Sequence, residues 1–326
     1  MQPKVLNVNQ LMGINSQKNQ IDTPFEQCAP NNHGLNSGVI MRNLCRPYKA
    51  LGLGVLWGLV SVSAHANCLG DAKATLTHKF DVVPQFTATR IYTAWSPLLQ
   101  RVGQASGLCF ELRVAASIPE FEQKLLSGEP AFAFVNPYHA VLAHKKQRYA
   151  PLLSDGEEML KGILVVRQDS PMRQLQELQG KTLAYPAPNS FAATLLIRAE
   201  LAKKKVDTQA QFVKTHSNVY RNVIQAEVAG GGGVNNTLDS ELPEVRQQLR
   251  ILYETASYYP HPVVTHPSIS AATRDKFFKA FAALAQDEAG KKLLDGVGIN
   301  KPMAVNYNKH YKVLEDLGLE KFSTLN

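Results

Sequence analysis

The amino-acid sequence predicts an α/β protein of two lobes, with a ligand cleft and a hinge between them. Strand-like and helix-like segments alternate from Thr75 onward, which is typical of mostly parallel sheets covered by helices. The 260 residues that follow position 66 suit two lobes of about 100–150 residues each. The last predicted helices follow a chain return near Leu252 to Thr265, so the chain is expected to cross between the lobes twice.

The N-terminal part of the chain is not expected to belong to this fold. Residues 41–66 have the features of a secretory signal peptide: basic residues after Met41, an uncharged run rich in Leu, Gly and Val, and an A-x-A cleavage site at Ala64 to Ala66. An uncleaved anchor is the alternative, but the uncharged run of 17 residues is shorter than the ~20 that span a bilayer. Residues 1–40 are polar and unpatterned, and we interpret them as a non-native or disordered extension.

The composition of the predicted mature chain limits its partners. Removing residues 1–66 removes five of the 35 Lys and Arg and two of the 27 Asp and Glu, which lowers the formal net charge from +8 to +5. A moderate positive charge suits an anionic ligand. The basic residues are scattered except for Lys203 to Lys205, at the end of a predicted helix where cations complement the helix dipole. A nucleic-acid partner is therefore not expected.

Only two of the four cysteines, Cys68 and Cys109, lie in the predicted mature chain. An exported pair can form a disulfide, which would attach the mature N-terminus to the first lobe. The alternative is a buried Cys109 and a free Cys68. The chain has no C-x-x-C or H-E-x-x-H motif, so neither a metal nor another cofactor is predicted.

The first predicted lobe alternates apolar strands with amphipathic helices. Ser117 to Glu120 is a capping box with Pro119 in the first helical turn, and Ala131 to Val135 is an apolar run typical of a strand buried on both faces. The expected strands are Thr75 to Phe86, Cys109 to Ala115 and Ala131 to Val135, and the expected helices are Tyr92 to Ser106, Ser117 to Leu126 and Asn136 to Gln147.

The second predicted lobe has the same alternation, and the chain then returns to the first. We assign residues 67–157 and 253–326 to lobe 1 and residues 158–252 to lobe 2. The expected later strands are Gly162 to Arg167, Thr182 to Tyr185, Gln211 to Thr215, Gly230 to Val234, Arg250 to Tyr253 and Pro262 to Thr265, and the expected later helices are Leu175 to Gln179, Phe191 to Lys205, Asn218 to Val228, Ser270 to Leu294 and Asn308 to Leu317.

Polar residues gather at the predicted strand-to-helix turns, where open α/β sheets bind ligands. Ser190 begins a long predicted helix, and helix N-termini attract oxyanions; ordinary capping is the alternative. Glycine lets a backbone approach a ligand closely, which makes the run from Gly230 a further candidate. The candidate ligand-binding residues are Tyr92, Asn136, Tyr138, Ser190, His216, Ser217, Gly232 and Asn235.

Several classes of protein lack support in the sequence. No G-x-x-x-x-G-K-[ST] or G-x-G-x-x-G motif indicates a nucleotide site. No G-x-S-x-G or S-x-x-K motif indicates a nucleophilic enzyme. A binding protein that is not an enzyme is therefore the favoured prediction.

Four segments, taken in order, resemble one family: AFAFVNPYHAVLAHKKQRYAPLL, KGILVVRQDSP, LQELQGKTLAYPAPNSFAAT and GGGVNNTLD. They are similar to the periplasmic phosphate-, phosphite- and phosphonate-binding proteins of ABC transporters, over nearly all of Thr75 to Gly298. The resemblance implies a type II periplasmic-binding-protein fold and a small oxyanion ligand closed between the lobes. It also implies a periplasmic location, a permease partner in the inner membrane and a monomer.

The resemblance carries over to particular residues. Ser190 matches a ligand-binding hydroxyl at the helix start, His216 matches a histidine at the next strand-to-helix turn, and Tyr92 matches an early tyrosine. Phe191 and Ala192 stand where studied phosphonate binders have further hydroxyl residues, and no acidic residue that would hold an aminoalkyl group is evident near Gly230 to Gly233. An aminoalkyl phosphonate is therefore disfavoured, and phosphate, phosphite or another small oxyanion, including a simpler phosphonate, remains open. A module presenting ligand to a membrane sensor, or an enzyme on the same scaffold, is the alternative function.

Overall fold

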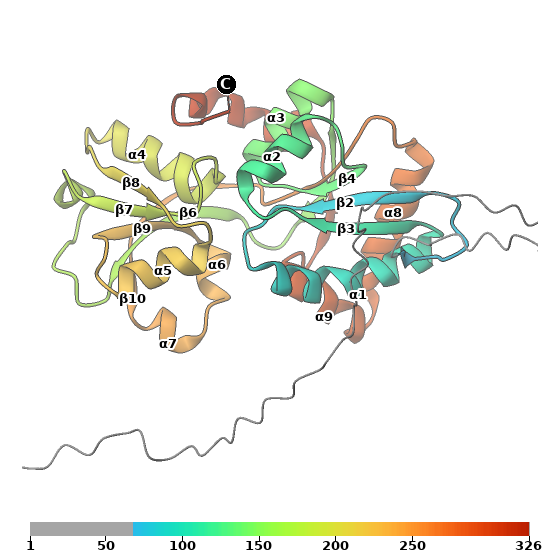
Figure 1. Ribbon diagram of the computed structural model, residues 1–326, viewed down its shortest axis with the longest axis horizontal. Coiled ribbons are helices and arrows are strands. Elements are labelled where there is room, and N and C mark those ends of the chain that lie inside the picture. Colours follow the sequence, from blue (N-terminus) through green and yellow to red (C-terminus); the bar gives the residue numbers. More distant parts are fainter. Residues whose placement is uncertain (1–67, 326) are drawn as a thin grey trace, which may run out of the picture. The chain divides into compact units, whose positions relative to one another are not determined.

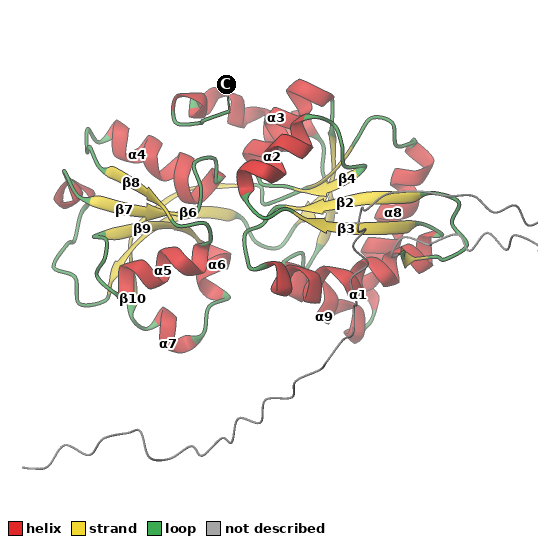
Figure 2. Ribbon diagram, viewed as in Figure 1, coloured by secondary structure: helices red, strands yellow, loops and turns green. Residues whose placement is uncertain are grey.

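A computed structural model describes residues 68–325 of the chain. These residues lie within one compact unit and form two sheets that helices cover (Figures 1 and 2). The predicted N-terminal extension and signal peptide lie outside the described residues. Within residues 68–325, no helix is both long enough and apolar enough to cross a membrane.

The first sheet has seven strands in the described part of the chain, in the order β1-β3-β2-β4-β11-β5-β12. Its strands are β1 (Leu69–Gly70), β2 (Thr77–Val82), β3 (Cys109–Val114), β4 (Phe132–Phe134), β5 (Ala150–Asp155), β11 (Val263–Thr265) and β12 (Pro302–Ala304), and the helices of this lobe are α1 (Ala88–Ser106), α2 (Ile118–Leu126), α3 (Pro137–Gln147), α8 (Ala271–Ala283) and α9 (Glu288–Val297).

The core of this lobe is aromatic. Phe80, Phe110, Phe132 and Phe277 are fully buried, and the rings of Phe132 and Phe277 lie 4.9 Å apart. These four side chains bring α8 onto the strands β2, β3 and β4, so the late helix joins the early strands in one lobe.

The second sheet has the order β10-β6-β9-β7-β8. Its strands are β6 (Leu160–Arg167), β7 (Thr182–Tyr185), β8 (Gln209–Phe212), β9 (Gly230–Val234) and β10 (Leu249–Tyr258), and its helices are η1 (Leu175–Leu178), η2 (Phe191–Leu196) continuing as α4 (Ile197–Lys203), α5 (His216–Ile224), α6 (Asn235–Asp239) and α7 (Pro243–Arg246).

The glycines of β9 have a packing role in this sheet. A Cβ on Gly232 would lie 1.9 Å from the carbonyl oxygen of Ala193, and one on Gly231 would lie 2.4 Å from a methyl carbon of Val219. Because no side chain fits at either position, η2 and α5 approach the strand closely. The glycine run is thus required for helix-to-sheet packing.

The expectation of mostly parallel sheets is wrong, because both sheets are mixed. β2 pairs in parallel with β3 and β4, and β7 with β8 and β9. However, β11 is antiparallel to β4 and β5, and β6 is antiparallel to β9 and β10. The chain enters β6 directly from the first lobe and β11 directly from the second. Neither strand therefore follows a helical crossover from another strand of its own sheet, which is the connection that makes two strands parallel.

The expected single helix from Ser270 to Leu294 is also wrong. The chain leaves α8, makes the short helix η3 (Leu284–Gln286), and begins α9 after Asp287, whose carboxylate accepts a hydrogen bond of 2.8 Å from the Gly290 amide. An N-cap of this kind starts a new helix. Likewise, the segment expected as one helix after Asn308 consists of η4 (Tyr307–Tyr311) and η5 (Lys312–Leu317), followed by η6 (Leu319–Lys321).

Two short segments join the sheets and lie side by side. The first runs from the end of β5 to β6, and the second from the end of β10 to β11. The Ser154 hydroxyl donates to the carbonyl oxygens of Pro260 and His261, both at 3.1 Å, and the Tyr311 hydroxyl donates to that of Pro260 at 2.9 Å. β5 pairs with β11, and β6 pairs with β10, so only a few residues of each segment lie between the two sheets.

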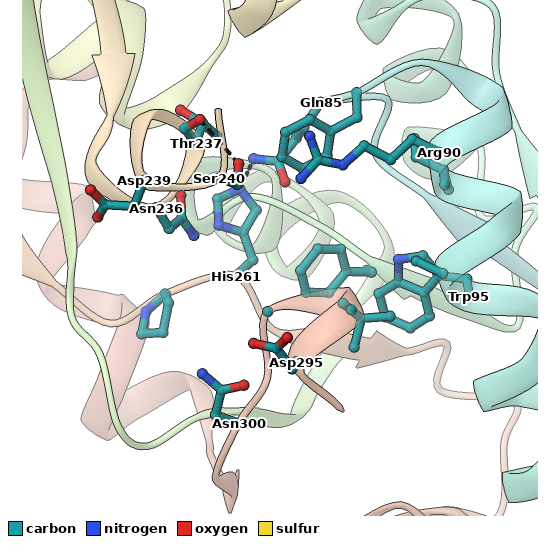
Figure 3. Close-up of a pocket in the computed structure, with 18 of the residues that line it drawn as sticks. Gln85, Arg90, Trp95, Asn236, Thr237, Asp239, Ser240, His261, Asp295 and Asn300 are labelled. Carbon is teal, nitrogen blue, oxygen red and sulfur yellow. Dashed lines mark hydrogen bonds between the residues drawn. The ribbon is translucent and has the colours of Figure 1, made fainter. Parts of the chain in front are cut away.

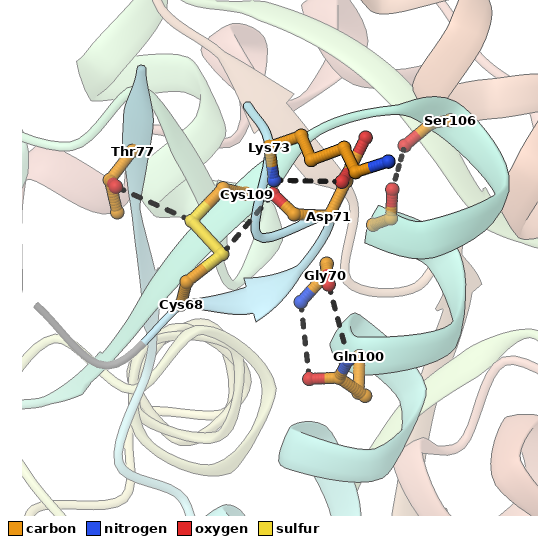
Figure 4. Close-up of a disulfide and its surroundings, with 9 residues drawn as sticks. Cys68, Gly70, Asp71, Lys73, Thr77, Gln100, Ser106 and Cys109 are labelled. Atoms are coloured by element: carbon orange, nitrogen blue, oxygen red, sulfur yellow. Dashed lines mark hydrogen bonds between the residues drawn. A yellow bond between two sulfur atoms is a disulfide. The ribbon is translucent and has the colours of Figure 1, made fainter. Parts of the chain in front are cut away.

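The start of the described chain is attached to the first lobe. A disulfide joins Cys68 and Cys109, and the Gln100 side chain accepts from the Gly70 amide at 3.1 Å and donates to the Gly70 carbonyl at 3.2 Å (Figure 4). Gly70 has φ +134°, and a Cβ there would lie 2.2 Å from the Leu108 carbonyl oxygen. Only glycine therefore allows this close approach of β1 to β3.

Candidate functional site

A small cavity of about 10 Å³ lies where the two lobes meet, and it has room for about one water molecule. Asn136 and Ser190, two of the residues predicted from the sequence, line it together. The lining residues are Val83, Gln85, Ile118 and Asn136 from the first lobe, Ser190, Phe191, Ala192 and Val234 from the second, and His261 from the second crossing segment.

Ser190 begins the continuous helix η2–α4 at the cavity wall. Its carbonyl oxygen accepts hydrogen bonds from the amides of Thr194 at 2.9 Å and Leu195 at 3.0 Å. As far as the structure describes the chain, its hydroxyl makes no capping hydrogen bond. The first N–H groups of a helix have no intrahelical partner and carry partial positive charge. This end of the helix can therefore stabilise an oxyanion, with the Ser190 hydroxyl as a further donor.

Asn136 connects the two lobes at the cavity. Its side-chain oxygen accepts from the His139 amide at 2.7 Å and so caps α3, while its amide nitrogen donates to the Asn189 carbonyl oxygen at 3.2 Å. Asn136 is buried. Its side chain thus fixes the distance between the start of α3 and the turn before η2.

His216 is the first residue of α5, is only 1% exposed, and is not among the residues that line the small cavity. Its Nε2 has no hydrogen-bond partner among the described residues, and its Nδ1 lies 3.5 Å from the Thr237 hydroxyl. Burial lowers the pKa of His216 to about 4, so the imidazole is neutral at pH 7 and has one N–H that can donate.

The two predicted tyrosines are not brought to the cavity wall. Tyr92 is 43% exposed on α1. Tyr138 is buried, but in an apolar cluster that includes Val141, Leu160 and Phe191. Its ring therefore packs between α3 and the second lobe.

The three other predicted residues make structural contacts. The Ser217 hydroxyl donates to a carboxylate oxygen of Glu241, and Gly232 packs against η2. The Asn235 amide donates to the Glu158 carboxylate and the Met159 carbonyl oxygen, both at 3.1 Å. Asn235 thus holds the first crossing segment against α6.

Sequence reasoning missed Gln85 and His261, which line the small cavity together. The Gln85 amide donates to Nε2 of His261 at 2.8 Å. Burial, with smaller contributions from His139 and His216, lowers the pKa of His261 to about 3. The sequence signal was the position of His261 between two prolines in the predicted return crossing, where a two-lobed fold places residues beside its cleft.

A larger pocket of about 300 Å³ adjoins the small cavity and shares Gln85 and His261 with it. Its walls include residues of α1, α6, both crossing segments and the end of α9 (Figure 3). Its lining includes the aromatic residues Phe86, Trp95 and Phe134 and the charged residues Arg90, Glu158, Asp239 and Asp295. The Arg90 guanidinium lies 3.9 Å from the centre of the Phe86 ring.

A buried polar network lies beside the small cavity. Glu122 is 1% exposed; one of its carboxylate oxygens is 2.8 Å from Nε2 of His139, and the other accepts from the Asn189 amide at 3.0 Å. The Asn189 side-chain oxygen accepts from the Thr324 amide at 2.9 Å. The network therefore joins α2, α3, the turn before η2 and the C-terminal segment.

Residues 80–311 match the family model described as ABC transporter, phosphonate, periplasmic substrate-binding protein. The chain belongs to this family. A curated relative, the phosphonates-binding periplasmic protein of Escherichia coli (strain K12), is 21% identical over 234 residues, which cover 67% of this chain and 69% of the relative.

Solved structures show the same fold. A binding-protein component of an ABC phosphonate transporter from Pseudomonas aeruginosa has a TM-score of 0.67 at 17% identity, covering 75% of this chain and 86% of that one. PhnD1 from Prochlorococcus marinus, in complex with methylphosphonate, has a TM-score of 0.69 at 12% identity, covering 75% and 98%. The predicted two-lobed periplasmic-binding-protein fold and the family resemblance are thus confirmed.

Family membership defines the role of the chain. It is the periplasmic substrate-binding component of an ABC phosphonate transporter. Such a protein has a small-molecule ligand and a membrane permease as its partner, and its role is transport.

Proposed function

We propose that this protein captures a phosphonate, or the related oxyanions phosphite and phosphate, in the small cavity between the lobes. The observation that carries the proposal is the uncapped Ser190 hydroxyl at the buried start of η2–α4, where helix N–H groups and the helix dipole favour an anion. The methylphosphonate bound to the structurally similar PhnD1 supports this class of ligand.

The proposed ligand contacts are Ser190, Asn136 and His216. Ser190 and the first-turn amides of η2 would donate to the oxyanion, the Asn136 amide would donate from the opposite lobe, and His216 would donate through a ring N–H. Tyr138, Ser217, Gly232 and Asn235 would support the site through the packing and hydrogen bonds described above. Tyr92 would lie outside it.

Capture requires motion, because a cavity of about 10 Å³ is smaller than any phosphonate. The lobes would separate by bending at the unpaired residues between β5 and β6 and between β10 and β11. The ligand would favour the closed state only through its greater affinity for that state. No bond is made or broken in this cycle, so the proposal is a binding function without catalysis.

The proposal includes export and a monomeric state. Residues 41–66 would direct the chain to the periplasm and be removed before Asn67, and the mature protein would act as a monomer on the permease. N-terminal sequencing of the exported protein should begin at Asn67, and a sequence that retains Leu51 to Val60 would contradict cleavage.

Ligand binding can be tested on residues 67–326 by thermal shift and isothermal titration calorimetry. The probes are methylphosphonate, phosphite, phosphate and sulfate. A ligand present at 100 times its Kd should stabilise the folded state by about 2.7 kcal/mol. Because hydrogen bonds to charged groups contribute about 1.5–3 kcal/mol, we expect Ser190→Ala to weaken binding by about tenfold or more.

Ser270→Ala is a matched control. Ser270 also begins a helix, but its hydroxyl caps α8 by accepting from the Thr273 amide at 3.1 Å. Its loss should cost about 1 kcal/mol of stability and leave the Kd unchanged. The proposal fails if no phosphorus oxyanion binds, or if Ser190→Ala binds as tightly as the unmodified protein.

A further inference from the structure

The small cavity contains no fixed positive charge. Among the described residues that line it there is neither Lys nor Arg. A buried carboxylate lies nearby instead: the Asn136 amide nitrogen is 3.3 Å from Nε2 of His139, which is 2.8 Å from the Glu122 carboxylate. Burying an anion costs free energy unless it is paired and hydrogen-bonded, so a positive charge beside the neutral donors would further stabilise a bound oxyanion.

Two buried histidines can supply that charge. His261 lines the cavity and is 6% exposed, and His216 is 1% exposed. Because the Gln85 amide donates to Nε2 of His261, the neutral ring carries its proton on Nδ1, and protonation would require the Gln85 amide to turn. Nε2 of His216 has no partner within residues 68–325. His139 differs from both, because the Glu122 carboxylate already pairs with it.

We propose that oxyanion binding is coupled to the uptake of one proton by the pair His216 and His261. The inference rests on the proposed function, since it concerns the same bound oxyanion; His261 lines the small cavity, whereas His216 is not one of its lining residues. The proton comes from solvent and forms a single N–H bond on one imidazole, and no other bond changes. The closed complex then buries the anion together with an imidazolium.

The electrostatics of the free protein are consistent with this coupling. Burial lowers the pKa of His216 to about 4 and that of His261 to about 3, so both are neutral in the free protein near neutral pH. An anion within hydrogen-bond distance favours the charged imidazole and raises its pKa. The charged or titratable groups around the pair are Glu122 and His139 from α2 and α3, Arg90 from α1, Glu158 from the first crossing, Asp239 from α6, Asp295 from α9, Tyr220 from α5 and Glu241, which accepts from Ser217.

The coupling predicts the sign of the pH dependence. Between the pKa of the free protein and the higher pKa of the complex, the complex holds one proton more than the free protein. The Kd should therefore rise by up to about tenfold for each pH unit in this range and level off above it.

Titration calorimetry with methylphosphonate at pH 6, in buffers of different ionisation enthalpy, counts the protons taken up. Methylphosphonate can exchange protons itself, so the count is compared between proteins. The unmodified protein should take up about one proton more than the double variant His216→Asn/His261→Asn. His266→Asn is the matched control, because His266 lies outside both cavities and contacts Ser268; its uptake should equal that of the unmodified protein.

A second measurement does not depend on the variants. Histidine-specific ¹⁵N NMR of the unmodified protein at pH 6 should show one buried imidazole that is neutral without methylphosphonate and cationic with it. Binding without a cationic imidazole, or with equal proton uptake in the double variant, would overturn the coupling and leave the proposed function standing. Failure of methylphosphonate, phosphite and phosphate to bind anywhere between pH 5 and 8 would overturn both.

Discussion

His216 and His261 also make the stability of the ligand-free protein depend on pH. In an unfolded chain a histidine has its ordinary pKa of 6.5, whereas burial holds these two at about 4 and about 3. Below pH 6.5 the unfolded chain therefore binds more protons than the folded one. The free energy of unfolding should fall as the pH falls from 6.5 toward 4, by about 1.4 kcal/mol per pH unit for each histidine.

We predict that His216→Asn reduces this pH dependence. Urea unfolding at several values between pH 4.5 and 7.5 gives the slope of the free energy of unfolding against pH. This slope, and not the absolute stability, is compared between the unmodified protein and its variants. In His216→Asn the slope should decrease by about 1.4 kcal/mol per pH unit, which is the contribution of one histidine. In His266→Asn it should stay unchanged. Parallel curves for all three proteins would contradict a neutral, buried His216.

At the level of elements, the bond between Cys68 and Cys109 should hold the chain start to the first sheet. The two cysteines are 41 positions apart, and closing a loop of that size stabilises a protein by about 4 kcal/mol in the chain-entropy model. Replacing both cysteines by serine should lower the free energy of unfolding by about 2–4 kcal/mol in urea. The Kd for methylphosphonate should not change, because β1 lies outside both cavities; a large loss of affinity would contradict this separation.

Local signals in the sequence predicted most of the helices and strands. Strand direction and the strand β5 could not be predicted in this way, because they depend on contacts between distant segments. The capping box at Ser117 marked the start of α2, and the structure shows the Ser117 hydroxyl accepting from the Glu120 amide. Strand direction was misjudged because pairing depends on which lobe each strand enters, and no local pattern encodes that. β5 was missed for a related reason, since Ala150–Asp155 is recognisable as a strand mainly through its partners β11 and β12.

The candidate site shows the same limit. Ser190 and Asn136 could be found because each begins a helix after a strand. Gln85 and His261 lie in irregular segments 176 positions apart, and a single 2.8 Å hydrogen bond joins them. Such a pair becomes predictable only once the loop after β2 and the second crossing segment have been placed beside the cavity.

In the whole molecule, the C-terminal segment contacts both lobes. Tyr311 and Leu314 pack in one apolar cluster with Tyr138 of α3 and Phe191 of η2, and the Arg198 guanidinium donates to the Phe322 carbonyl oxygen at 3.0 Å. This cluster connects the lobes beside the small cavity. The opening proposed above would expose part of this apolar surface, which would oppose it, so the ligand and the C-terminal segment should favour the same closed state.

Small-angle X-ray scattering on residues 67–326 can test whether the lobes close around the ligand. A compact chain of this length has a radius of gyration of roughly 18 Å. Methylphosphonate should lower the radius toward that value, because the cavity must open to admit the ligand and then close over it. Ser190→Ala, at a methylphosphonate concentration that saturates only the unmodified protein, should keep the ligand-free radius. If the unmodified protein binds methylphosphonate in calorimetry but its radius stays the same, the ligand enters without separation of the lobes, and the two crossing segments do not act as a hinge.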